Sequence, residues 1–525
     1  MEYLGTLMLG FVVTVVITKI WQLFRVLLWR PYVLTKLFES QGVKGPSYKL
    51  LYGSLNEIKK LKKIARETVL DVNSNDDITC RVLPQNHKWS SEYGDTVLFW
   101  NGTEPRIIVT EPELAKQILS NKFGFYVKPY IKPVLQKLAG KGLILVEGRD
   151  WVRHRRILNP AFSMNKLKIM IKKMADCTIS MLEEWQTRAV LQETENCKIE
   201  MSESFQELTG DIIAHTAFGS SYLQGKEVFK GQKEFQKLLA VALTDINIPG
   251  IQYFPTESNL RIWKLDRKVK NTLSNIIQNR LKAEPCSDGC YGDDLLGLMI
   301  GSAIHKSNDE KSQSSAELSM DEIMEECKTF FFAGQETTSS LLTWTIFLLS
   351  KHQDWQEKLR QEVLNECEMQ VPDADMLAKL KFVNMVLLEA LRLYSPIIAL
   401  SRKVTENIKL GNLTIPKDTC LTIPLVQIQR SKKHWGEDAN EFNPMRFANG
   451  ISKAAKHPNA FLAFSMGPRA CIGQNFAILE AKTVLVLILQ RFSFCLSFEY
   501  KHAPIDHITL HPQYGMPIVV KPLHF

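Results

Sequence analysis

A stretch of roughly 35 residues, Leu318–His352, most constrains the fold of this 525-residue chain, because its helical pattern is apolar around most of its circumference. A helix with apolar residues on every side has to be covered by protein on every side. Ser319 and Glu322 have the spacing of a capping box, which marks the start of a helix. We therefore expect a long helix that crosses the middle of a globular body.

The rest of the chain predicts a mainly α fold with small β-sheets, that is, the α+β class. Segment after segment from Leu114 to about Leu281 has helical periodicity, whereas Thr96–Trp100 and Arg106–Thr110 resemble strands that flank a turn. The polar segment His305–Leu318 is expected to be an exposed loop. With 45% hydrophobic and 23% charged residues, the chain can bury a substantial core and does not resemble a disordered or fibrous protein.

Residues 1–30 predict a membrane anchor. Tyr3–Thr18 carries no charge, Lys19 and Arg25 can extend their charged ends to the interface, and the apolar pattern continues to Trp29. Spanning a bilayer takes about 20 such residues. A secretory signal would begin with positive charge, whereas here Glu2 comes first and positive residues follow. We expect an uncleaved, single-pass anchor in the endoplasmic reticulum membrane, with a lumenal N-terminus and a cytosolic body; a buried core helix is the alternative.

Residues 31–53 are expected to form a hinge, because Gln41–Gly53 is rich in glycine and contains a proline, and residues 54–525 to form a single domain. The net charge of +9 is modest and its basic residues are spread along the chain. This distribution favours a membrane or an acidic partner and argues against a nucleic-acid partner. The ten cysteines lack the paired spacings of a zinc site; Cys286 and Cys290 have no second pair nearby, so we expect no metal there.

Polar residues interrupt the apolar surface of the long helix in the sequence AGQETT, Ala333–Thr338. Burying a carboxylate and hydroxyls without partners would cost stability. Gly334 leaves space where something could approach the backbone, and the Thr337 hydroxyl can donate to the carbonyl of Ala333 and loosen the helix. The alternative is a kink with no function.

Charged residues recur in three further motifs. In EALR, Glu389 and Arg392 lie on one face of a helix, where an ordinary surface ion pair is the simplest interpretation. FNPMRF places Arg446 in a loop turned by proline. In DWVRHRR, Trp151 and Arg155 are four residues apart, so an indole N–H and a guanidinium face the same way and suit a carboxylate.

The loop FSMGPRACIG, Phe464–Gly473, places one cysteine between two glycines, with an arginine two residues before it. Taken in order, these motifs resemble the cytochrome P-450 family of haem-thiolate monooxygenases across nearly the whole chain. The loop resembles that family's haem-binding loop, AGQETT its oxygen-activation motif, EALR its paired helix motif and FNPMRF its arginine loop. Other details are most similar to the plant clan of terpenoid, hormone and fatty-acid hydroxylases. Met445 departs from the family, since many relatives have a glutamate there.

This resemblance implies a triangular helical body around a buried haem b whose iron is bound by Cys471, the metal ligand. Gly467 and Gly473 would allow a tight turn and close approach to the porphyrin, and Phe464 would shield the sulfur from water. Thiolate ligation favours cleavage of the O–O bond. The resemblance also implies residues that contact the haem or its propionates, namely Arg469, Trp151, Arg155, Arg402, Ala333 and Gly334.

Two further roles follow from the resemblance. Thr337 and Glu336 would be the catalytic groups that deliver protons during oxygen activation, because a dry pocket excludes bulk water. Glu389, Arg392 and Arg446 would form a structural network, in which losing one member leaves buried charge unpaired.

The implied function is a membrane-anchored monooxygenase that hydroxylates an apolar small molecule with O2 and electrons from NADPH. No glycine-rich nucleotide loop is present, so a separate flavoprotein reductase is expected as partner, together with membrane lipid. A reductase-independent isomerase or dehydratase, and a non-catalytic haem-binding membrane protein, are the alternatives. Regions that resemble the family's pocket lining are Phe330, Phe331, Ala333, Ile397–Leu400 and Phe123–Tyr130. The basic residues expected to face the reductase are Arg153, His154, Arg155, Arg156, Lys453 and Lys456.

Overall fold

The computed structural model describes residues 2–74, 77–191, 197–219, 228, 231, 233–235, 238, 253–282, 291–292, 294–304 and 317–523. Cys286, Cys290 and most of the expected loop at 305–318 lie outside these residues. The chain divides into two compact units. The first unit comprises Met1–Thr68, Thr79–Pro129 and Ala399–Gln427, and the second comprises Val69–Ile78, Tyr130–Ile398 and Ile428–Phe525. The single domain over residues 54–525 stays a prediction.

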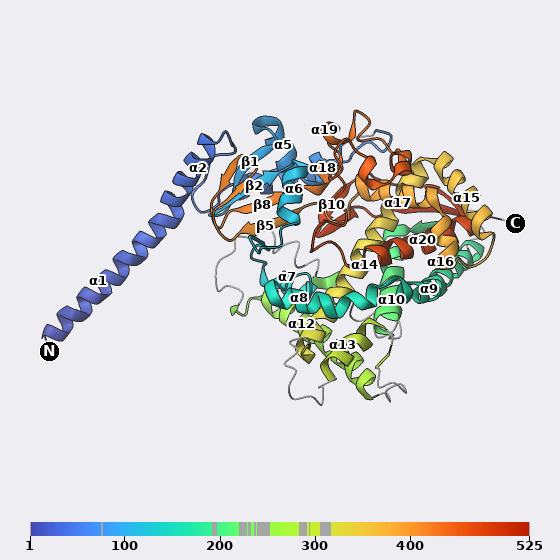
Figure 1. Ribbon diagram of the computed structural model, residues 1–525, viewed down its shortest axis with the longest axis horizontal. Helices are drawn as coiled ribbons and strands as arrows, with labels where there is room; N and C mark the ends of the chain where they lie inside the picture. The colour runs from blue at the N-terminus through green and yellow to red at the C-terminus, as the bar shows by residue number, and fades with distance from the viewer. Residues whose placement is uncertain are drawn as a thin grey trace. The chain divides into compact units, whose positions relative to one another are not determined.

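The first unit begins with a long, exposed helix. It is made of α1 (Glu2–Phe24), a π-helical segment η1 (Arg25–Trp29) and α2 (Arg30–Ser40), and it extends away from the sheet of this unit (Figure 1). Tyr3–Ser40 is long and apolar enough to cross a membrane. The hinge expected at residues 31–53 begins too early, because α2 continues to Ser40. Pro31 does not break this helix, since it lies in the first turn of α2, where proline is tolerated.

The sheet of the first unit has the strand order β1-β2-β8-β5-β3. The two strands expected from the sequence are confirmed as β1 (Thr96–Asn101) and β2 (Glu104–Val109), an antiparallel pair in the register Thr96↔Val109. Its remaining elements are β8 (Cys420–Ile423), β5 (Leu400–Val404), β3 (Tyr126–Val127), the pair β6 (Ile408–Leu410) and β7 (Leu413–Ile415), and the helices α3 (Leu55–Glu67), α4 (Thr79–Val82), α5 (Pro84–Tyr93) and α6 (Pro112–Leu119).

The second unit is mainly helical (Figure 1). Its helices are α7 (Pro133–Ala139), α8 (Gly148–Leu158), η2 (Asn159–Phe162), α9 (Met164–Leu191), α10 (Met201–Phe218), α12 (Glu257–Lys282), α13 (Leu295–Ile304), α14 (Met320–Lys351), α15 (Gln353–Cys367), α16 (Ala374–Lys379), α17 (Lys381–Leu393), α19 (Lys432–Trp435), η4 (Pro444–Asn449), η5 (Ile451–Lys453) and α20 (Gln474–Arg491). Helix α18 (Leu425–Gln429) spans the division of the chain. The strands are β4 (Cys197–Glu200), β9 (Phe492–Leu496), β10 (Pro504–His507), β11 (Thr509–Pro512) and β12 (Pro517–Pro522).

Helix α14 is the long central helix expected from the sequence, and its capping box is confirmed. The Ser319 hydroxyl accepts from the backbone N–H of Glu322 at 3.2 Å, and the Glu322 carboxylate accepts from the N–H of Ser319 at 2.8 Å. Phe331, Trp344 and Phe347 are fully buried along it. Burying each such side chain contributes about 1.5–3 kcal/mol, so packing rather than helix propensity holds α14 in place.

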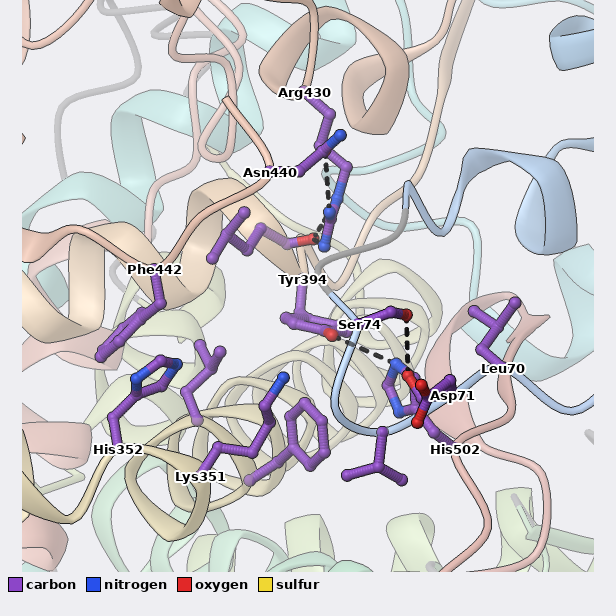
Figure 2. A pocket seen from close by; sticks show the side chains of 14 residues that line it. Leu70, Asp71, Ser74, Lys351, His352, Tyr394, Arg430, Asn440, Phe442 and His502 are labelled. Carbon is purple, nitrogen blue, oxygen red and sulfur yellow. Dashed lines mark hydrogen bonds between the residues drawn. The ribbon is translucent and has the colours of Figure 1, made fainter. Parts of the chain in front are cut away.

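A small cavity lies beside the C-terminal half of α14 (Figure 2). Tyr394 stacks on Trp344 with ring centroids 4.4 Å apart, and the Tyr394 hydroxyl lies 3.3 Å from Nε2 of His502. The cavity measures about 20 Å³, which is room for about one water molecule. It is therefore a packing feature and is too small for an organic ligand.

Candidate functional site

The cysteine loop turns tightly before α20. The backbone N–H of Cys471 donates to the carbonyl of Phe464 at 2.9 Å, which closes the loop on itself. Gly467 has φ +73° and Ser465 has φ +59°, both in the left-handed region, so glycine is needed at the first position and the second is strained. Gly473 has φ −89°, which any residue adopts. Its expected role in the turn is therefore wrong, and only the close approach stays a prediction.

Cys471 has an exposed side chain, but neighbouring protein atoms still shield its sulfur from much of the water. Burial raises the pKa of its thiol, while the backbone N–H of Gly473 and the positive charge of Arg155 act in the opposite direction. Cys471 also lies just before the N-terminus of α20, whose free N–H groups favour a negative charge. Burial outweighs these effects, so the pKa of the free thiol is raised overall, and it is the binding of a metal ion to the sulfur that removes the thiol proton.

Two arginines hold this loop against α8 and the residues just before it. Nη1 of Arg155 donates to the carbonyl of Ala470 at 3.0 Å. Nη2 of Arg469 donates to the carbonyl of Val146 at 2.9 Å and pairs with the Glu147 carboxylate. The Arg469 guanidinium also lies 4.8 Å from the centroid of the Trp151 ring. The structure thus brings Arg469, Trp151 and Arg155 together and adds Glu147, which was missed; the contacts of these residues with haem propionates stay a prediction.

One donor of this cluster has no partner among the described residues. Nη1 of Arg469 is buried without a hydrogen bond, although the other end of the same guanidinium is paired. A buried donor of a charged group needs an acceptor, and a carboxylate is the best match for a guanidinium. An accessible cysteine sulfur with such a donor nearby suits a flat metal-containing group that carries carboxylates.

Arg402 belongs to the first unit, on β5. It is buried, and its Nη1 donates to the carbonyl of Ser401 at 2.8 Å. Its expected contact with a propionate stays a prediction.

The AGQETT segment lies in the middle of α14. The Thr337 hydroxyl donates to the carbonyl of Ala333 at 2.7 Å, which confirms the hydrogen bond expected from the sequence. A Cβ at Gly334 would lie 2.8 Å from Cδ1 of Ile213 on α10. The neighbouring helix α10 thus approaches the backbone at Gly334, as the missing side chain indicated, and the contact of Gly334 with a cofactor stays a prediction. Ala333 is half-buried, and its place beside a cofactor stays a prediction.

Glu336 turns from α14 toward β11. Its Oε2 lies 3.1 Å from the Thr509 hydroxyl and 3.0 Å from Nε2 of His511. Neither partner was predicted, but Thr509 and His511 are two residues apart in a strand, so their side chains share one face. This alternation could have shown from the sequence that Thr509 and His511 lie on one face of a strand, but not that this face meets Glu336.

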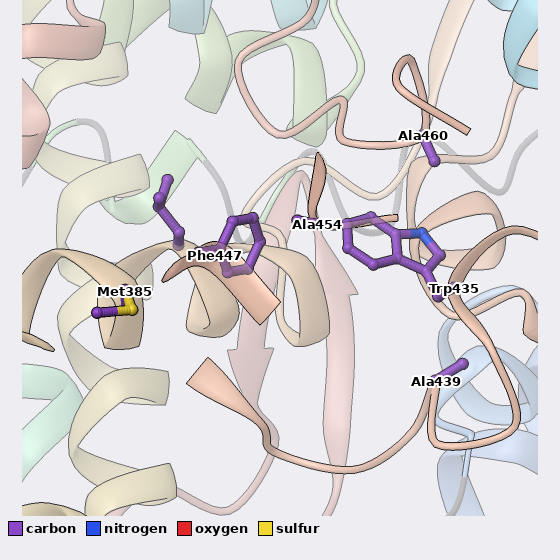
Figure 3. Close-up of a cluster of buried hydrophobic side chains, with 7 residues drawn as sticks. Met385, Trp435, Ala439, Phe447, Ala454 and Ala460 are labelled. Carbon is purple, nitrogen blue, oxygen red and sulfur yellow. The ribbon is translucent and has the colours of Figure 1, made fainter. Parts of the chain in front are cut away.

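Glu389 and Arg392 form a fully buried, bidentate ion pair, with 2.7 Å from Nε to Oε2 and 2.8 Å from Nη2 to Oε1. The interpretation as a surface pair is therefore wrong. Nε of Arg446 lies 3.4 Å from the same carboxylate, and the Arg392 guanidinium lies 4.9 Å from the centroid of the Trp435 ring. Trp435 belongs to a buried cluster that supports the segment before the cysteine loop (Figure 3), with Met385, Leu388, Ala439, Phe447, Ala454 and Ala460.

The basic residues expected to face a reductase divide into two groups. Arg153 pairs with Glu322, and Nδ1 of His154 lies 2.5 Å from the buried Glu326, so both are committed to holding α8 on α14. Burial opposes the charged form of His154, but the hydrogen bond and negative charge of Glu326 outweigh it, and the pKa of His154 is raised. Arg155 is likewise committed, through its bond to the carbonyl of Ala470, and the exposed members are Arg156, Lys453 and Lys456.

A second pocket, of about 470 Å³, lies between α9 and α10. Cys177, Asp211 and His215 place one sulfur, oxygen and nitrogen ligand atom within 4.8 Å of one another near it. Burial and the neighbouring carboxylate of Asp211 raise the pKa of Cys177 to about 12. The thiol is therefore protonated at neutral pH, and its interaction with Asp211 accounts for the cluster.

Comparison with known proteins decides the family. A family model described as Cytochrome P450 matches residues 81–517. The chain belongs to the cytochrome P450 family. Cytochrome P450 709B3 of Arabidopsis thaliana is 55% identical over 526 residues, covering 100% of both chains. Cytochrome P450 709B1 of the same plant is 54% identical over 510 residues, covering 96% of each chain, and cytochrome P450 734A1 is 40% identical over 524 residues, covering 98% of this chain and 96% of the relative.

Membership explains the cluster around Cys471. Cytochromes P450 carry haem bound through a cysteine thiolate, and the mainly helical fold with small sheets is the fold of this family. Its relatives are plant cytochromes P450 of the 709, 72 and 734 groups, in agreement with the plant clan that the sequence motifs indicated. An accessible sulfur at the start of α20 and a buried, unpaired donor on Arg469 fit a haem with its carboxylates.

Proposed function

We propose that this cytochrome P450 hydroxylates an apolar small molecule, with Cys471 as the ligand of the haem iron. The observation that carries the proposal is the loop itself, in which the sulfur is accessible, lies at the start of α20 and is framed by Arg155 and Arg469. When bound, thiolate-ligated haem supplies the chemistry that reduces dioxygen and cleaves the O–O bond.

Arg469 in the loop, and Trp151 and Arg155 on the neighbouring helix α8, would each have a separate task. Arg469 would hold a haem propionate through its unpaired Nη1, since its Nη2 is already bonded to Val146 and Glu147. Trp151 lies against the same guanidinium and fixes its plane, so the donor is held before the cofactor binds. Arg155 ties α8 to the carbonyl of Ala470 and places a positive charge near the sulfur, which favours the thiolate.

Thr337 and Glu336 are proposed as the proton-delivery pair. The Thr337 hydroxyl donates to the carbonyl of Ala333, so its oxygen stays available as an acceptor at a half-buried position. Glu336 is the next residue on α14 and is buried with hydrogen-bond partners. A carboxylate beside a hydroxyl on an apolar helix can pass protons where bulk water is excluded.

Electrons are proposed to come from NADPH through a separate flavoprotein reductase, as is typical of the family. Arg156, Lys453 and Lys456 are exposed basic residues in the second unit, near the chain segments that frame the cysteine loop, and would attract an acidic partner. The N-terminal helix would anchor the chain in the endoplasmic reticulum membrane, with its N-terminus lumenal and the body cytosolic. The substrate classes we propose to screen are terpenoids, hormone-like lipids, fatty acids and xenobiotics.

The test combines a spectrum with turnover. The full-length protein in membranes is reduced and exposed to carbon monoxide, then mixed with reductase, NADPH and a substrate that changes the haem spin state. A thiolate-type spectrum with NADPH-dependent hydroxylated product supports the proposal. Product formed from a peroxide without reductase would point to an isomerase or dehydratase, and a haem spectrum without turnover on any of the four classes to a non-catalytic haem protein.

A further inference from the structure

Three side-chain atoms meet where β11 crosses α14. Besides its bond to Thr509, Glu336 Oε2 lies 3.0 Å from Nε2 of His511, and that nitrogen lies 2.7 Å from the Thr509 hydroxyl. Glu336 has 5% of its side chain exposed and His511 has 14%. The cluster therefore begins at a carboxylate inside the protein and ends at an imidazole that reaches solvent.

The backbone holds this cluster in register. The carbonyl of Leu510, between the two β11 residues, accepts from the Ser340 hydroxyl at 2.7 Å and from the Trp344 indole at 3.1 Å. Both donors lie on α14, one and two turns after Glu336. These two hydrogen bonds hold strand β11 on α14 independently of Glu336. A purely structural role for the Glu336–His511 contact is redundant with these two bonds.

The chemistry of the groups sets the direction of the bonds. An ionised carboxylate only accepts, so the Thr509 hydroxyl donates to Glu336. His511 Nε2 lies within reach of both oxygens and donates when it carries a proton. Across the β10–β11 pair, His507 faces Thr509 and Asp506 faces Leu510, so these are the titratable groups on the neighbouring strand.

We propose that His511 is a positioning residue that orients Glu336 and passes protons from solvent to it, with the Thr509 hydroxyl as a bridge. Nε2 gives its proton to the carboxylate directly or through Thr509, which accepts one proton as it donates its own. The imidazole takes a replacement proton from solvent at Nδ1 as it gives up the one at Nε2, so its net charge is unchanged, and it returns to the Nε2-protonated tautomer by proton exchange with solvent before the next transfer. The proposal rests on the proposed role of Glu336 and Thr337, because it supplies the protons that those residues consume.

The test separates the donor role from the relay role. His511→Gln keeps an N–H that can reach Glu336 but cannot exchange a ring proton, whereas His511→Phe removes both functions. Thr509→Val removes the bridging hydroxyl with little change in shape. His87→Gln, at an exposed position on α5 of the first unit, is the matched control.

Each full-length variant is loaded with haem and assayed for haem content, product per NADPH and hydrogen peroxide. The infrared carboxyl band of Glu336, assigned with Glu336→Gln, is followed against pH as a readout independent of turnover. We expect His511→Gln and His511→Phe to lower product per NADPH by about tenfold, the lower part of what positioned proton donors contribute. In His511→Phe, the band of the protonated Glu336 carboxyl should appear at a higher pH than in wild type, because the carboxylate loses the N–H donor of residue 511. In His511→Gln, which keeps a donor, the band should not move.

Wild-type product per NADPH in His511→Gln would overturn the relay, and an unmoved carboxyl band in His511→Phe would overturn the positioning role. Should His511→Phe fail to bind haem, His511→Gln and Thr509→Val still decide the relay, and the infrared titration of the haem-free variant decides the positioning. Thr337→Ala is run in parallel. If that variant keeps wild-type coupling, the proposed proton-delivery role fails; if it is uncoupled while His511→Gln is not, the relay alone fails.

Discussion

Arg392→Ala is expected to destabilise the protein through one identifiable loss of pairing. Arg392 and Glu389 are both fully buried. Removing the guanidinium leaves the carboxylate with the backbone N–H of Asn443 at 2.9 Å and the more distant Nε of Arg446 at 3.4 Å. It also removes the donor to the carbonyl of Gln429 at 2.8 Å. Breaking a buried pair in this way costs about 3–5 kcal/mol, a large part of the roughly 5–15 kcal/mol that stabilises a folded protein.

A second ion pair with the same spacing gives a matched control. Glu113 and Lys116 are also three residues apart on a helix, with 3.6 Å between the charged atoms, but their side chains are 65% and 49% exposed. Lys116→Ala is therefore expected to cost less than about 1 kcal/mol. Arg392→Lys should fall between the two, because lysine keeps the charge but cannot make the bidentate contact.

The assay compares the thermal unfolding midpoint and the haem content of the three variants in the same membrane preparation. Arg392→Ala should give the lowest midpoint and little haem-loaded protein, with Lys116→Ala close to wild type. An unchanged midpoint and full haem content in Arg392→Ala, together with lost turnover, would refute the structural interpretation. That result would assign the pair a role in the reaction.

Three further predictions concern the site. Thr337→Ala should keep the haem spectrum and NADPH consumption but lower product per NADPH by about tenfold or more, with hydrogen peroxide rising in its place; equal coupling would leave Thr337 as a helix-bending residue only. Burial lowers the pKa of His154, but Glu326 raises it by more, so the folded-state pKa is raised overall. The contribution of protonated His154 to the free energy of unfolding is therefore fully present below about pH 6.5, the unfolded-state pKa, and is lost as pH rises through the folded-state pKa. The midpoint difference between wild type and His154→Gln should therefore shrink between pH 6 and pH 9, and a constant difference would contradict it. Replacing Lys453 and Lys456 with glutamate should raise the reductase concentration needed for half-maximal turnover by roughly tenfold at low salt. A dependence of turnover on salt that matches wild type would exclude these residues as the reductase-binding face.

Relations within one helix were predictable from the sequence, because helix geometry alone determines which residues meet. Ser319 and Glu322 form the expected cap, and the Thr337 hydroxyl bonds the carbonyl of Ala333 four residues before it. The anchor helix, by contrast, was ended too early at residue 30. That bound rested on the apolar pattern, which ends at Trp29, whereas the helix continues through α2 to Ser40.

Relations between distant segments were predicted only where a family resemblance supplied them. The pairing of Arg469 with Glu147 and of Glu336 with His511 joins residues more than one hundred positions apart, and no local spacing encodes such a contact. Burial is not encoded by local spacing either, since Glu389 and Arg392 have the spacing of a surface pair; the family resemblance implied a buried network, and the structure shows both side chains fully buried. Gly334 shows the same limit, because its space is filled by Ile213 from another helix.

The reduced, carbon-monoxide-bound spectrum of Cys471→Ser tests the proposed haem ligation most directly. Cys495, an exposed cysteine on β9 of the same unit, provides the control variant Cys495→Ser. We predict that Cys495→Ser keeps the spectrum of a thiolate-ligated haem and that Cys471→Ser loses it, in protein whose fold is verified by its unfolding midpoint. A thiolate-type spectrum that survives in Cys471→Ser would contradict the assignment and place the haem iron on another cysteine.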